Sequence, residues 1–187
     1  MNATARSSPE ATRLAVPLVV GGAVAVALGV YGKAHDPTHH TLLSLFFSDT
    51  IHMKAWLGTL VVVLAVVQVL TAMRLYGKLS VPRTAPAWLG DFHRLTGTLA
   101  FVVSLPVAFH CLWSRGFQSS FDNGRTLVNS VLGCLFYGAF AAKVICVRTK
   151  RLPGWSLPVV GGLVFTALVA VWLTSSLWFF RTIGTGI

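Results

Sequence analysis

Long apolar stretches separated by short polar connectors dominate the pattern of this chain. Five of them are long enough to cross a hydrocarbon core of about 30 Å at about 1.5 Å per helical residue. Charged residues, proline and glycine gather in the connectors between them. The pattern predicts an all-α, polytopic integral membrane protein, a bundle of five transmembrane helices at residues 14–31, 51–75, 92–113, 126–147 and 157–180.

The five spans are expected to form one membrane domain over residues 14–181, between a polar tail at 1–13 and a short tail at 182–187. Composition agrees, because 11% of the residues are charged, whereas a soluble domain carries about 25%. Arg6 and Arg13 precede the first span, as in a secretory signal. No small-residue cleavage site follows, so we expect an uncleaved first helix.

The basic residues predict the orientation of the spans. Placing the N-terminus inside puts ten Lys and Arg residues on the cytoplasmic side and five outside. Cytoplasmic connectors normally hold the excess of Lys and Arg, which favours N-in/C-out in a plasma membrane, the inner membrane of a bacterium. The net charge of +10 does not indicate nucleic acid, because the cations lie between apolar spans and not on one soluble face. The lipid bilayer is the expected partner.

Three histidines at span ends are the candidate chemistry. His52 opens the second span, while His93 and His110 lie at the two ends of the third. Ionisable side chains are costly in a bilayer, and imidazole is a good iron ligand. Helical rise separates His93 from His110 by about 25 Å, too far for one cofactor. His52 and His110 share a depth on consecutive antiparallel helices, so they are the favoured axial pair for a haem b.

The environment of His93 leaves several alternatives open. It has no histidine at its own depth, and Met73 is the nearby thioether. A lone ligand site, a hydrogen bond to a backbone carbonyl and a headgroup-level position are all compatible with the sequence. Lys54, Arg94 and Arg115 accompany the three histidines, either as partners of haem propionates or as snorkelling contacts to lipid.

The connector between the first two spans contains a separate group of histidines, His35, His39 and His40. His35 and His39 have i, i+4 spacing, which would suit a metal in a helix, but Pro37 interrupts the segment. A solvated loop, a zinc or copper site and a spare haem ligand remain alternatives.

The segment WLGDFHRLTG, from Trp88 to Gly97, resembles the cytochrome b561 and ferric-reductase-like group of membrane haem proteins. In that group a His-Arg-x-x-Gly pattern opens a haem-bearing helix. The resemblance covers residues 51–113 and implies a helical core in which paired histidines hold b-type haems and pass electrons across the membrane. The preceding span is similar in its Gly58, Gln68 and Arg74.

This chain departs from that pattern in two ways. Lys54 stands where the family-like register would place a histidine in the second span, and the fourth and fifth spans contain no histidine. The resemblance therefore implies a reduced, one-haem relative or a haem-free descendant. The chain also resembles short actinobacterial-type membrane proteins of unknown function.

Two functions compete at this point. One is a b-type cytochrome-like protein that relays single electrons through a histidine-ligated haem, with a redox protein or a quinone as partner. The other is a haem-free scaffold or accessory subunit of a larger membrane complex. A transporter is less favoured, since Gln68 and Asn129 are the main polar groups near the membrane midplane. No hydrolase or transferase site is visible, so an enzymatic role would be that of an oxidoreductase subunit.

Overall fold

The computed structural model describes residues 9–40, 43–79, 84–119 and 123–184, and for residues 9–11 only the backbone. The described part is helical and contains no strand. Five helices are long and apolar enough to cross a membrane, which confirms the predicted fold class of a five-span, all-α membrane protein. Their bounds are Thr12–Ala34, Thr50–Leu75, Leu89–Arg115, Gly124–Arg148 and Ser156–Thr182.

Two of the five spans change their helical pitch along their length. α3 (Leu89–His110) continues into a π-helical turn, η1 (Cys111–Arg115), and α5 (Ser156–Trp172) continues through η3 (Leu173–Leu177) into α6 (Trp178–Thr182). The other spans are α1 (Pro9–Ala34), α2 (Thr50–Leu75) and α4 (Gly124–Arg148).

Side-chain caps and left-handed glycines set several helix ends. The Asp49 carboxylate accepts the His52 backbone N–H (2.8 Å) at the start of α2, and Asn123 accepts the Thr126 N–H (3.3 Å) at the start of α4. α2 ends at Leu75, and the φ of 68° at Gly77 lets the Lys78 N–H turn back to the Met73 carbonyl at 2.8 Å.

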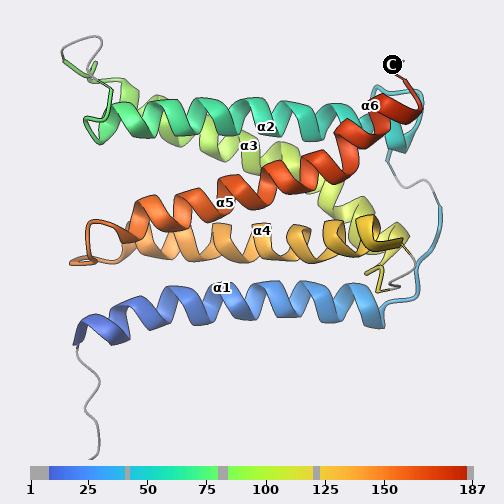
Figure 1. Cartoon of the computed structure of the whole chain (residues 1–187), viewed down its shortest axis with the longest axis horizontal. Helices are drawn as coiled ribbons and strands as arrows, with labels where there is room; N and C mark the ends of the chain where they lie inside the picture. Colours follow the sequence, from blue (N-terminus) through green and yellow to red (C-terminus); the bar gives the residue numbers. More distant parts are fainter. Residues whose placement is uncertain (1–8, 41–42, 80–83, 120–122, 185–187) are drawn as a thin grey trace, which may run out of the picture. The chain divides into compact units, whose positions relative to one another are not determined.

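The chain divides into two compact units, each assembled from separate segments. Unit 1 contains residues 1–36 and 117–171, and unit 2 contains residues 37–116 and 172–187. In unit 1, α1 packs antiparallel to α4 (Figure 1). In unit 2, α2 packs antiparallel to α3, and η3 also packs on α2.

The α1–α4 crossing of unit 1 is close because small residues face each other. A Cβ on Gly21 would lie 2.6 Å from the Gly138 carbonyl oxygen, and one on Gly138 would lie 2.5 Å from that of Gly21. Ala25 and Ala142, each four residues further along its helix, complete the contact. Such small-xxx-small faces allow backbones to approach in lipid, where helices associate through packing.

Candidate functional site

All three span-end histidines lie in unit 2, on the antiparallel pair α2–α3. Polar residues gather toward both ends of this pair. Gln68, Thr71, His93 and Thr96 share hydrogen bonds and form the His93 cluster. We use the name His110 cluster for the polar residues toward the other end, which are Asp49, Thr50, His52, Lys54 and His110.

The His93 cluster is closely hydrogen-bonded. The Gln68 amide nitrogen donates to the His93 carbonyl at 2.5 Å and to the Thr96 hydroxyl at 2.6 Å. The Thr71 hydroxyl lies 2.7 Å from the His93 Nδ1. Polar side chains that bond across helices stabilise their packing in a membrane. This end of the pair therefore joins α2 to α3.

The Thr71 hydroxyl has several partners within hydrogen-bond distance. It lies 2.8 Å from the Val67 carbonyl and 3.1 Å from the Gln68 carbonyl of its own helix, in addition to the His93 Nδ1. The direction of the bond to His93 depends on which imidazole nitrogen carries the proton.

Gly97 has a packing role in the same cluster. A Cβ at Gly97 would come within 2.9 Å of the Gln68 Oε1. The glycine therefore makes room for the amide that binds the His93 carbonyl and Thr96. The His-Arg-x-x-Gly segment thus takes part in helix packing through both its histidine and its glycine. Its arginine, Arg94, forms an exposed ion pair with Asp91 at 2.8 Å.

The Gln68–Thr96 hydrogen bond fixes which residues of α2 and α3 lie opposite each other. Because the two helices are antiparallel, residues at equal distances from this bond toward the His110 end also lie opposite each other. Fourteen residues before Gln68 is Lys54, and fourteen after Thr96 is His110, each on nearly the same face as its starting residue. Lys54 and Arg115 are both close enough to act electrostatically on the His110 imidazole.

Buried polar atoms of the His110 cluster lack partners. His110 is 5% exposed and Thr50 is 4% exposed. In the part of the chain that the structure describes, neither the His110 Nδ1 nor the Thr50 Oγ1 has a hydrogen-bond partner. A buried polar group without a partner costs about 1–3 kcal/mol, so atoms of this kind call for an explanation, such as a bound group.

His52 is oriented by the residue that caps its helix. Its Nδ1 lies 2.7 Å from Asp49 Oδ1, and its ring meets Phe179 of α6 edge-on at 4.9 Å. Donation from the His52 backbone N–H and ring to the carboxylate holds the pKa of Asp49 below its ordinary value. A carboxylate that accepts from Nδ1–H leaves Nε2 for a ligand, as in metal-binding histidines.

The loop that precedes α2 is fastened to the π-helical turn after His110. The Thr38 N–H donates to the Trp113 carbonyl at 3.4 Å, and the His39 N–H to that of Ser114 at 3.1 Å. The buried Ser114 hydroxyl donates to the His40 carbonyl at 2.8 Å. π-helical turns inside α-helices occur often at functional sites. Here the turn brings the histidine-containing loop to the end of α3.

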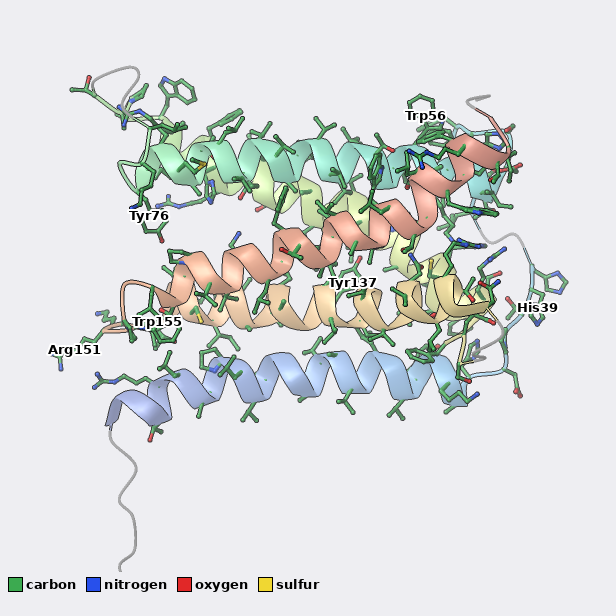
Figure 2. All side chains as sticks on the ribbon, in the orientation of Figure 1. His39, Trp56, Tyr76, Tyr137, Arg151 and Trp155 are labelled. Carbon is green, nitrogen blue, oxygen red and sulfur yellow. The ribbon has the colours of Figure 1, made fainter. Side chains whose placement is uncertain are left out.

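The loop histidines do not share a helix. α1 ends at Ala34, and His35 stacks on Tyr31 with ring centroids 5.4 Å apart. His39 is exposed with φ 55°, and Figure 2 shows its ring on the loop. The i, i+4 arrangement that a helical metal site would need is therefore not formed. Among the described residues, no group of three or more His, Cys, Asp or Glu side chains is placed to hold a metal ion.

A haem iron needs fewer protein ligands than a bare metal ion, because the porphyrin supplies four nitrogens and one or two side chains complete the coordination. The His110 cluster fits this donor requirement. It contains an imidazole held through Nδ1 by a carboxylate, a second imidazole with an unpaired buried nitrogen, and neighbouring cations suited to carboxylate groups. Sequence reasoning identified the histidines but missed Asp49 and Thr50. The Asp-x-x-His spacing at a helix start was the available signal for Asp49.

Comparison with protein families places the chain. A model described as a family of unknown function, DUF6529, matches residues 14–187, which include all five spans. The chain belongs to DUF6529. No curated protein and no solved structure matches it. The expected likeness to membrane proteins of unknown function is compatible with DUF6529, whereas no family match supports the cytochrome b561 resemblance.

Proposed function

We propose that this DUF6529 protein is a membrane electron-transfer protein that holds a b-type haem at the His110 cluster. The observation that carries the proposal is the contrast between the two ends of α2–α3. The His93 cluster is tied by short hydrogen bonds, whereas the His110 cluster leaves buried polar atoms of His110 and Thr50 without partners among the described residues.

Four residues of the His110 cluster, together with Arg115, have a part in this proposal. His110 and His52 would hold the haem iron, and Asp49 would orient His52 by accepting from the His52 Nδ1–H. Lys54 and Arg115 would pair with the carboxylate groups of the haem. When bound, the haem supplies reversible one-electron chemistry. The apolar spans exclude water from the site, and a quinone or a redox protein is the partner that this chemistry requires.

The second candidate is a haem-free scaffold or accessory subunit of a larger membrane complex. The His93 cluster favours it, because the His-Arg-x-x-Gly segment that suggested haem is used in joining α2 to α3. In this reading the histidines are structural.

The absorption spectrum of the purified protein, produced with haem supplied, separates the two candidates. The reduced-minus-oxidised spectrum should show a b-type α band that is lost in His110→Ala and in His52→Ala. His39→Ala is the matched control, since it removes an exposed imidazole and should leave the band intact. A band that survives both site variants would disprove the assigned ligands. A folded, colourless wild-type protein would establish the haem-free alternative.

A further inference from the structure

One end of unit 1 gathers basic side chains from two helices and a turn. Arg148 ends α4, and Lys150 and Arg151 lie in the turn before α5. Arg13 joins them from α1, because Gly21 opposes Gly138 and the antiparallel register then puts Arg13 beside the last turn of α4. Lys143 lies within α4, five residues before Arg148. We call Arg13, Lys143, Arg148, Lys150 and Arg151 the basic end of unit 1.

These cations are not neutralised by the described part of the protein. The two ion pairs found there, Asp49–His52 and Asp91–Arg94, both belong to unit 2. None of the five side chains of the basic end forms an ion pair or a hydrogen bond with a described residue. Glu10 is the acid nearest in sequence, and its side chain lies outside the described part. Five cations against at most one carboxylate leave a strong excess of positive charge.

The backbone presents this charge outward. Arg151 has φ 61°, a left-handed conformation that is uncommon and strained for a residue other than glycine. Figure 2 shows its side chain at the tip of the α4–α5 turn, pointing away from the helices. Trp155, which directly precedes α5, is 57% exposed. An exposed tryptophan at the end of an apolar span is typical of the headgroup level of a bilayer.

The depth of Lys143 indicates which anion fits. This half-buried lysine lies five residues inside the end of α4, about 7 Å along the helix from Arg148. A snorkelling ammonium group from that depth meets phosphates at the membrane interface. Arg148, Lys150 and Arg151 lie further toward the end of α4 and in the turn after it. A soluble anion would bind the exposed arginines and leave Lys143 aside, whereas lipid phosphates contact cations at both depths.

We propose that the basic end of unit 1 is a binding surface for the headgroups of anionic glycerophospholipids in the adjoining leaflet. This inference is independent of the haem proposal, since it involves different residues in the other unit. In the predicted N-in orientation the leaflet is the cytoplasmic one, whose negative surface potential attracts juxtamembrane cations.

Native mass spectrometry of the full-length protein with phosphatidylglycerol and phosphatidylcholine tests the proposal. Wild type should retain phosphatidylglycerol preferentially. The variant Arg148→Gln/Lys150→Gln/Arg151→Gln should bind it on the order of 100-fold more weakly at low salt, since each interfacial cation contributes a severalfold effect. The control Lys33→Gln/Arg125→Gln/Arg181→Gln removes the same charge elsewhere and should bind as wild type.

Three outcomes would overturn the proposal. One is an equal loss of lipid in the control variant, which would indicate a net-charge effect. Another is equal retention of the two lipids by wild type. The third is a stronger displacement of phosphatidylglycerol by inorganic phosphate than by chloride at the same ionic strength, which would indicate a site for free phosphate. The conservative variant Arg148→Lys/Arg151→Lys should keep the preference and guards against misfolding as the cause of a loss.

Discussion

At the first turn of α2, a single carboxylate both caps the helix and orients an imidazole. Asp49 accepts the backbone N–H of His52 at 2.8 Å and the ring of the same residue at 2.7 Å. These donors favour its ionised form, so the pKa of Asp49 is lowered in the folded protein. A lowered carboxyl pKa stabilises the fold above the ordinary value, and that stabilisation is lost as the pH falls through the folded-state value.

Asp49→Asn should therefore remove an acid-dependent step in stability while keeping the cap, because asparagine is an equally good N-cap acceptor. Wild type should lose melting temperature as the pH falls below the ordinary Asp value of 3.8, and the Asn variant should lose less. Asp49→Ala should cost about 1 kcal/mol at neutral pH. The measurement is the melting temperature of wild type, Asp49→Asn and Asp49→Ala in detergent across a pH series. Identical acid profiles for wild type and Asp49→Asn would contradict the assignment.

The sequence could identify the histidines of unit 2 as candidate functional side chains, since histidines in apolar spans are rare and costly. It could not predict their partners. Thr71 reads as an ordinary span residue, yet its hydroxyl meets His93 at 2.7 Å. That contact depends on which faces of α2 and α3 meet. Both helices carry apolar side chains around their circumference, so the sequence does not show which face is in contact. The contrast between the bonded His93 cluster and the unpaired atoms of the His110 cluster emerged only from the structure.

Among the elements, the spans were the most predictable feature. Each predicted span lies within an observed helix, because length and apolarity alone determine whether a segment can cross a bilayer. The helices extend up to five residues beyond the predicted ends, and polar caps such as Asp49 and Asn123 lie at the starts of two of them. The π-helical turns η1 and η3 were not predicted, since a change of pitch leaves no mark on apolar composition.

The α1–α4 crossing predicts opposite effects for two adjacent glycines. In Gly21→Ala the new Cβ would meet the Gly138 carbonyl oxygen at 2.6 Å, and a backbone atom cannot yield, so we expect a loss of about 1–3 kcal/mol. In Gly22→Ala nothing lies within 4 Å, and the better helix propensity of alanine should stabilise by up to about 1 kcal/mol.

Thermal unfolding of the two glycine variants in the same detergent provides the comparison. Gly21→Ala should melt below wild type and Gly22→Ala at or above it. If Gly21→Ala were as stable as wild type, the close crossing would not contribute to the stability of unit 1.

For the whole molecule, the distribution of charge predicts an orientation that the helices alone do not show. If the five spans alternate in direction, the sequence assigns ten Lys and Arg residues to the side of the N-terminus and five to the other side. A reporter enzyme active only outside the cytoplasm should therefore be active when fused after residue 187 and inactive when fused before residue 1. The reverse pattern would disprove the predicted N-in/C-out orientation.

The division of the chain into interleaved units has a consequence for its biogenesis. The backbone passes between the units three times, after residues 36, 116 and 171. During synthesis, α1 emerges first but finds its partner glycine only when α4 has followed, more than a hundred residues later. Unit 2 in turn waits for Phe179 to cover His52. We therefore expect unit 1 to complete its packing only after α4 has been inserted, and unit 2 only after α6 has been inserted.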